Sequence, residues 1–142
     1  MSQQLHLVIM SIIHDNYFGF DTLCNEIANL DNDIELVAVL NHKGRVIETK
    51  AREEGIDKAL TVQKREMFFM QSVLQTSMNR DHDNEFGKVK SSILERERFT
   101  TLSFEFHNYV ILVVSRPSLD PIQLKNSILE KMSSIRKVEL AQ

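Results

Sequence analysis

The acidic run Asp81-His82-Asp83-Asn84-Glu85 is the one cluster in this chain whose residue types and spacing resemble a metal site. Carboxylates at the first, third and fifth positions begin a calcium loop, which also needs glycine at its sixth position and an acidic residue at its twelfth. Those two positions hold Phe86 and Ser92. We therefore interpret the run as a solvated linker and expect no bound metal.

Other residues that could support chemistry are isolated from one another. Phosphate binding needs closely spaced glycines at the start of a helix, and the four glycines are far apart. They are Gly19, Gly44, Gly55 and Gly87. The five histidines also lack metal-ligand spacing. They are His6, His14, His42, His82 and His107. We expect no catalytic residues, no cofactor and no enzymatic activity.

Composition predicts one ordinary folded domain. The 142 residues are 42% hydrophobic and 26% charged, with a net charge of −3. This charge gives no basic field to attract nucleic acid. Cys24 is the single cysteine, so no intrachain disulfide can form, and we expect it to be buried as a small apolar residue. We also expect a cytoplasmic protein.

The first fifteen residues are predicted to be an apolar arm or extension. Leu5 to Ile13 is too short for the ~20 residues that span a bilayer, and no Lys or Arg precedes it as in a secretory signal. The segment is either an arm that docks on the domain or an extension, if translation starts at Met10.

The hydrophobic pattern of the first half predicts a helix, a hairpin and a second helix. Apolar residues recur every three or four positions over 16–30, as on one face of a helix. A nearly continuous apolar strand over 34–40 and a more polar one over 45–50 flank a turn with Gly44. Thr61 is a suitable N-cap for a helix over 62–80.

The second half predicts three strands and a closing helix. Val89 to Ile93 alternates with lysines, as in an edge strand. Strands over 99–106 and 109–114 follow, and we place the second of these centrally, beside the strand over 34–40. Asp120 and Pro121 predict the start of the last helix, and we expect its buried face to consist of Leu124, Ile128, Met132 and Ile135. The element order is αββαβββα.

The helix over 62–80 carries more apolar residues than one packed face needs. We expect its core stripe to be Met70, Val73, Leu74, Ser77 and Met78. Phe68 and Phe69 widen the apolar surface beyond this stripe. We therefore predict an interface between chains made by the helix and the edge strand. Its candidate residues are Phe68, Phe69, Lys88 and Lys90.

The hairpin Val39-Leu40-Asn41-His42-Lys43-Gly44-Arg45-Val46-Ile47 resembles the first hairpin of roadblock/dynein light chain-like domains. Gly87-Lys88-Val89-Lys90, followed by Glu95-Arg96-Glu97, is similar to an uncharacterised group of archaeal roadblock-like proteins. The resemblance covers 16–138 as a single domain, with 1–15 as the arm and 139–142 as a tail. It implies an α+β fold in which helices flank a five-stranded antiparallel sheet, as in a roadblock/profilin-like sandwich.

The resemblance also implies a function. Roadblock-like domains commonly dimerise through the second helix and third strand, and they serve as scaffolds or as regulators of small GTPases. The chain is thus expected to be a homodimeric interaction module whose partner is a small GTPase or another roadblock-like protein. The alternative is a small-ligand sensor of a related α/β sandwich type, with its ligand between sheet and helix. The sequence does not distinguish the partner, ligand or pathway.

Overall fold

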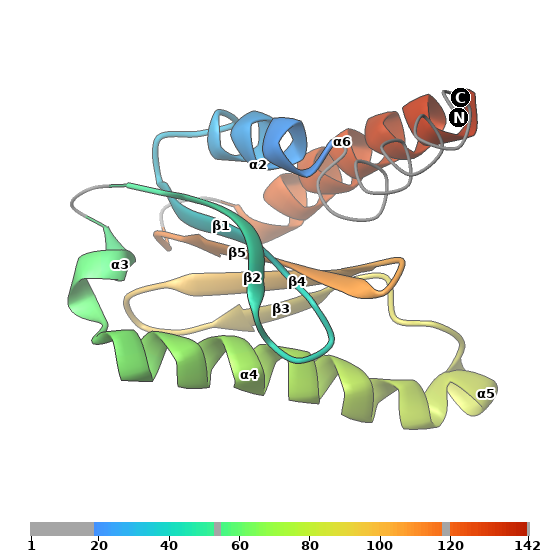
Figure 1. Ribbon diagram of the computed structural model, residues 1–142, viewed down its shortest axis with the longest axis horizontal. Coiled ribbons are helices and arrows are strands. Elements are labelled where there is room, and N and C mark those ends of the chain that lie inside the picture. The colour runs from blue at the N-terminus through green and yellow to red at the C-terminus, as the bar shows by residue number, and fades with distance from the viewer. Residues whose placement is uncertain (1–18, 53–54, 118–119, 142) are drawn as a thin grey trace, which may run out of the picture.

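The computed structural model describes residues 19–52, 55–117 and 120–141, so the apolar arm over 1–15 lies outside the described residues. A five-stranded antiparallel sheet forms the middle layer, in the order β2-β1-β5-β4-β3, with helices on both faces (Figure 1). Its strands are β1 (Ile34–Leu40), β2 (Val46–Ala51), β3 (Ser92–Glu95), β4 (Thr100–Phe106) and β5 (Tyr109–Ser115). The predicted α+β fold is confirmed.

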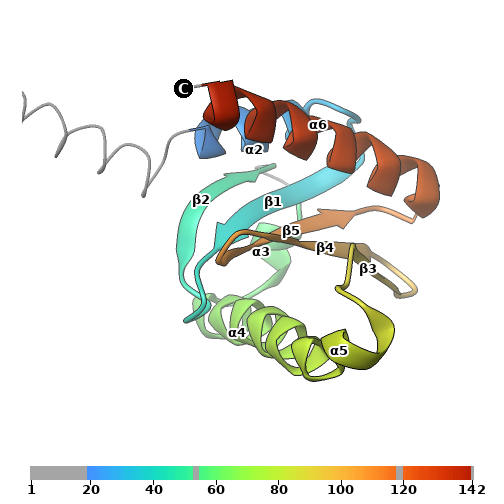
Figure 2. The same cartoon turned by 90° about the vertical axis from the view of Figure 1, so that its right-hand side faces the viewer.

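Two helices cover the upper face of the sheet, which we define as the face carrying Ile111 and Val113 (Figure 2). They are α2 (Phe20–Ala28) and α6 (Pro121–Ala141). Phe20 packs edge-on against Phe106 and Tyr109, with ring centroids 6.1 and 4.9 Å away. The face that we predicted α6 to bury is confirmed. It consists of Leu124, Ile128, Met132 and Ile135.

The lower face, which carries Leu112 and Val114, is covered by α3 (Ile56–Ala59) and α4 (Val62–Asn79) (Figure 1). Thr61 caps α4 as predicted, because its hydroxyl accepts a hydrogen bond from the Lys64 amide at 3.1 Å. β1 lies between β2 and β5, and all seven of its residues are buried. The predicted central position of β5, beside β1, is confirmed.

The linker predicted over 81–85 is instead helical. After α4 the chain continues through a 3₁₀ turn, η1 (Arg80–His82), and a short helix, α5 (Asp83–Phe86). Acidic side chains in the first turn stabilise the N-terminus of a helix. We had interpreted the same polar residues as a linker. Gly87 ends α5 with φ of 82°, a conformation that suits glycine.

β3 is an edge strand, as predicted, but it begins only at Ser92. Arg80 donates a hydrogen bond to Glu105 on β4 at 2.5 Å, near the place where a longer β3 would have paired. Because the chain must rise from α5 below the sheet, Lys88 and Lys90 lie in the approach to β3 and outside the strand.

Candidate functional site

The side of α4 that packs on the sheet consists of Phe69, Val73 and Thr76. Phe69 is only 3% exposed, so the prediction that its ring lies on the surface is wrong. Thr76 is buried because its hydroxyl is satisfied within the helix, donating to the Ser72 carbonyl at 3.0 Å. Phe69 therefore stabilises the fold and is not available for binding another chain.

The core stripe predicted for α4 is wrong except at Val73. Met70, Leu74 and Met78 are 41%, 52% and 61% exposed, and Ser77 also faces solvent. The helix has apolar residues on two sides, and a 3.6-residue period does not tell which side packs on the sheet. The exposed side is continued by Met67, which is 56% exposed. We call Met67, Met70, Leu74 and Met78 the outward stripe.

A groove opens between α4 and the strands beyond β5. On the lower face, β5 presents Val110, Leu112 and Val114, whereas β4 presents the half-buried Thr101 and Ser103. The groove has a volume of about 420 Å³. Its lining residues come from α4, β3, the turn after β3, β4 and β5: Phe68, Gln71, Ser72, Gln75, Asn79, Ser92, Ile93, Leu94, Arg96, Thr101, Ser103 and Leu112.

The α4 wall of this groove is a row of carboxamides. Gln71, Gln75 and Asn79 are spaced four residues apart, which places them on one side of the helix. The Gln75 amide donates to the Asn79 side-chain oxygen at 3.0 Å. Among the described residues that line the groove, Arg96 is the one with a charge, and none is a His, Cys, Asp or Glu. The groove therefore offers hydrogen bonds and apolar contact but no nucleophile–base pair.

The predicted interface residues do not form one patch. Phe68 is half-buried at the groove, with its ring centroid 5.8 Å from that of Phe69. Lys88 and Lys90 are exposed but do not line the groove. Of the four candidates, Phe68 alone lies where the helix and the edge strand face each other. The interface itself stays a prediction.

The outer edge of β3 has backbone groups available for pairing. The Arg96 amide donates to the Phe99 carbonyl at 2.9 Å, closing the hairpin between β3 and β4. In an antiparallel ladder successive residues point their amides inward and outward in turn, so the amides of Ile93 and Glu95 point outward. Within the described part of the chain no strand pairs with this edge.

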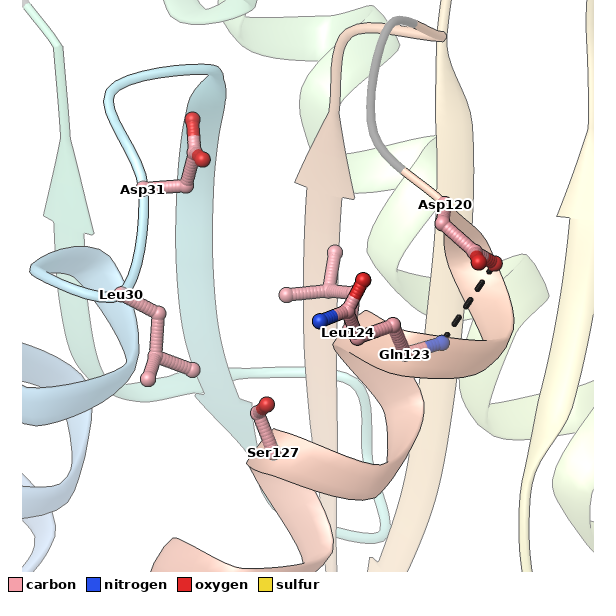
Figure 3. Close-up of a pocket in the computed structure, with 6 residues that line it drawn as sticks. All are labelled: Leu30, Asp31, Asp120, Gln123, Leu124 and Ser127. Atoms are coloured by element: carbon pink, nitrogen blue, oxygen red, sulfur yellow. Dashed lines mark hydrogen bonds between the residues drawn. The ribbon is translucent and has the colours of Figure 1, made fainter.

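A smaller pocket of about 180 Å³ lies between the end of α2 and the start of α6 (Figure 3). Leu30, Asp31, Gln123 and Ser127 line it, together with Asp120. The Asp120 carboxylate caps α6, accepting from the Ile122 amide at 3.0 Å and the Gln123 amide at 3.4 Å. The predicted cap is confirmed. Leu119, which would complete a hydrophobic staple with Leu124, lies outside the described residues.

A buried carboxylate lies near the start of β1, beside the residue that follows β5. Glu35 is only 2% exposed and accepts a hydrogen bond from the Arg116 guanidinium at 2.6 Å. Its second carboxylate oxygen, Oε2, has no hydrogen-bond partner among the described residues and lies against Gly55. Gly55 leaves room for this oxygen, which a Cβ at residue 55 would overlap unless the Glu35 side chain moved. This arrangement holds the entry to α3 beside β1.

The described residues contain no group of three His, Cys, Asp or Glu side chains that could hold a metal ion. In the same part of the chain, no helix combines the length and apolarity needed to cross a membrane. The candidate functional site that the described residues form is a surface, comprising the groove, the outer edge of β3 and the exposed side of α4.

Comparison with known proteins identifies the family. A family model described as a family of unknown function, DUF6659, matches residues 10–138, and the chain belongs to this family. No curated protein matches the chain. The closeness to an archaeal group that the sequence suggested stays a prediction.

Solved structures with a similar fold include roadblock proteins. A Roadblock/LC7 domain from Streptomyces avermitilis is 14% identical, with a TM-score of 0.66 over 85% of this chain and 98% of that chain. MglB from Myxococcus xanthus is 10% identical, with a TM-score of 0.66 over 85% and 87% of the two chains. MglC from the same organism is 12% identical, with a TM-score of 0.58 over 84% and 98%. The predicted roadblock-like fold is confirmed.

Two features of the site were missed from the sequence. The outward stripe has its own helical spacing of three, four and four residues, but Met70, Leu74 and Met78 were assigned to the core and Met67 was not considered. The carboxamides at 71, 75 and 79 also share one side of the helix, as their four-residue spacing could have indicated. The groove itself depends on where α4 crosses the sheet, and no local pattern encodes that position.

Proposed function

We propose that this protein is a non-enzymatic interaction module that forms a homodimer by pairing the β3 edges of two copies. One observation carries the proposal: the lower face beyond α4 is left open, next to a strand edge whose Ile93 and Glu95 amides point outward. An exposed edge is a ready template for another strand. A second copy would bring an identical edge and an identical α4 wall, as a two-fold interface requires.

The groove suits such an interface better than it suits catalysis. Its carboxamides and hydroxyls can be satisfied by backbone groups of another chain, whereas its lining offers no acid–base pair. Phe68 supplies an aromatic anchor of the kind enriched in interfaces. We place Lys88 and Lys90 at the rim, where exposed charges affect specificity more than affinity.

The comparisons are consistent with assembly without establishing it for this chain. One solved roadblock structure, 10% identical with a TM-score of 0.65, is described as MglB with a tetrameric arrangement. That description concerns MglB. For this chain, self-association is our proposal.

The test is the mass of the wild-type protein and of two variants at Glu95, measured by light scattering at micromolar concentration. Glu95→Pro removes an amide that points outward and breaks no hydrogen bond between β3 and β4. The expected result is half the wild-type mass with an unchanged circular dichroism spectrum. Glu95→Gln removes the charge but keeps the amide, and it should assemble like the wild type. A wild-type monomer, or equal masses for all three proteins, would contradict edge pairing.

The proposed partner of the assembled module is a small GTPase or another roadblock-like chain, in the cytoplasm, and this part rests on the family resemblance alone. Affinity capture with the wild type and with Phe68→Glu tests it, because Phe68 is half-buried at the groove. Phe69→Glu would place a carboxylate in the core and is unsuitable. Equal recovery of the same proteins by both baits would mean that the groove is not the contact surface.

The alternative is a small-ligand sensor, and the groove volume of about 420 Å³ favours it, since ligand sites typically measure ~300–1,000 Å³. A ligand would compete with the second copy for the same carboxamides. Loss of the dimer on addition of a purified small molecule, with a saturable rise in melting temperature, would support the sensor over the scaffold.

A further inference from the structure

The sheet has a second free edge at β2, on the side opposite β3 (Figure 2). β2 pairs with β1, and among the described residues no strand pairs with its other side. The Arg52 amide, just after β2, donates inward to the Glu35 carbonyl at 3.1 Å. Because amides alternate in direction along an antiparallel ladder, those of Thr49 and Ala51 point outward. This edge is six residues long, against four in β3.

The lower face of β2 is also open. Val46, Thr49 and Ala51 pair with the β1 residues that face α3 and α4, so they point to the lower face. All three side chains are nevertheless exposed, and Val46 is 42% exposed. A long free edge beside exposed apolar side chains favours aggregation, and natural proteins usually cover such an edge. One additional strand beside β2 would cover both the outward amides and part of this face.

The apolar arm contains a segment with the composition of such a strand. Residues 5–13 are Leu-His-Leu-Val-Ile-Met-Ser-Ile-Ile, with no Lys, Arg, Asp or Glu among them. Four of the nine are Val or Ile, whose β-branched side chains favour strands. Apolar residues occupy odd and even positions alike, which is typical of a strand covered on both faces.

The described part of the chain begins at the end of the sheet where β2 starts. Phe20, the first residue of α2, packs against Phe106 and Tyr109, and Tyr109 is the first residue of β5. The start of β5 pairs with the end of β1, and the end of β1 pairs with the start of β2. The arm therefore joins α2 above the end of the sheet from which β2 runs.

The arm is long enough to reach the β2 edge from this point. Neighbouring strands are ~4.8 Å apart, so a strand beyond β2 would lie ~14 Å from β5. If the strand uses residues 8–13, the connection to Gly19 is 14–18, and if it uses 5–10, the connection is 11–18. At ~3.3 Å per residue these connections span up to ~17 Å and ~26 Å.

We propose that residues 5–13 of the arm pair with the outer edge of β2 in the same chain, as a sixth strand. The pairing is antiparallel, because the arm runs towards the end of the sheet from which β2 runs away. A tethered segment has an effective concentration in the ~mM range, so it outcompetes a second copy of the chain at micromolar concentration. The arm thus covers one edge of the sheet and leaves the β3 edge to assembly.

The test is hydrogen exchange of single amides, followed by NMR in the full-length chain. Val8→Asp combined with Ile12→Asp places two charges in the proposed strand. Ser2→Asp combined with Gln4→Asp adds the same charges outside it and is the matched control. In the wild type and the control, the Thr49 and Ala51 amides should be protected. In the Val8→Asp, Ile12→Asp variant both should exchange at least about tenfold faster, as expected for a freed edge.

The Lys50 amide is the internal control, because it points towards β1 and should stay protected in all three proteins. Fast exchange of Thr49 and Ala51 in the wild type would mean that the edge is free and the proposal is wrong. Equal protection in both double variants would mean that another group covers the edge, which also contradicts it.

A mixing experiment separates the arm of the same chain from the arm of a second copy. Isotope-labelled Val8→Asp, Ile12→Asp protein is observed in the presence of excess unlabelled wild type, and its Thr49 and Ala51 amides should stay unprotected. Restored protection would show that an arm can bind from another chain and would overturn the pairing within one chain. The same results are expected in the Glu95→Pro background, because the proposed strand does not involve β3.

Discussion

β4 separates the two faces of the sheet most clearly, because its residues alternate between a sealed layer and an open one. Leu102, Phe104 and Phe106 point to the upper face and are buried under α2 and α6. Thr101 and Ser103 point to the lower face, where they are half-buried and line the groove. The same strand therefore contributes an apolar core on one side and a polar surface on the other.

This contrast indicates which part of the molecule contributes most to the stability of the monomer. The upper layer contains aliphatic and aromatic side chains from three strands and two helices, and these side chains are buried within the monomer. The lower layer is closed only over β1 and β5. A natural surface that keeps hydroxyls and carboxamides beside an unpaired edge is suited to another chain, and it contributes less to the stability of the monomer.

Cys24 tests how completely the upper layer is sealed. Burial, with smaller contributions from the nearby charges of Glu48 and Asp21, raises the pKa of its thiol from 9.0 to about 12. The thiolate is the reactive form, so native alkylation by iodoacetamide at pH 8 should be about a thousandfold slower than in urea. Mass spectrometry of quenched samples measures the two rates. Rapid native labelling would show that the upper layer opens.

The same shift predicts a stability change at high pH. Because the folded pKa of Cys24 is raised above the unfolded value, its contribution is complete below pH 9 and is lost as the pH rises towards 12. Cys24→Ala should remove this part of the pH dependence. Equal losses in the variant and the wild type would assign the effect to other groups.

The adjacent β4 residues Leu102 and Ser103 compare the two faces directly. Leu102 is fully buried, and Leu102→Ala should lower the free energy of unfolding by ~2–5 kcal/mol. Ser103→Ala, on the groove side, should change it by less than about 0.5 kcal/mol. Urea unfolding of both variants provides the comparison. Equal costs would mean that the groove side is as tightly packed as the core.

The sequence predicted the sealed half of the fold better than the open half. β1, β5 and the buried face of α6 were found because their apolar residues had a single explanation, burial. In α4 the apolar pattern had two explanations, because apolar residues lie on both sides of the helix. We assigned the side that bears the methionines to the core, but the side that packs on the sheet carries Phe69 and Thr76.

Parts of the candidate site follow from tertiary placement. The edge position of β3 was predicted from its lysines, yet Lys88 and Lys90 lie before the strand. The groove arises because α4 covers β1 and β5 and leaves β4 open, and this offset has no local sequence signal. The burial of Glu35 could not be predicted from the sequence either, because its partner Arg116 is 81 residues away in the chain.

Gly55→Ala probes that buried carboxylate. A clash with the end of a flexible side chain is usually relieved by rotation, but Glu35 is held by Arg116 at 2.6 Å and is surrounded by core residues. The expected cost is ~1–3 kcal/mol, as for other overpacked sites. In a double-mutant cycle, Glu35→Ala should remove most of the Gly55→Ala penalty, because the overlapping atoms are gone. Additive costs would show that the two residues do not conflict.

The smallest expected effect on monomer stability lies at the outward stripe. Leu74→Ser removes an apolar side chain that is 52% exposed, so it should change the free energy of unfolding by less than about 0.5 kcal/mol. Val73→Ser, one position away but buried against the sheet, should cost several times more because it leaves a polar group in the core. The measurement needs protein dilute enough to be monomeric, since assembly would add its own stabilisation. If Leu74→Ser is as costly as Val73→Ser under those conditions, the stripe belongs to the core, and α4 faces the sheet with its methionine side.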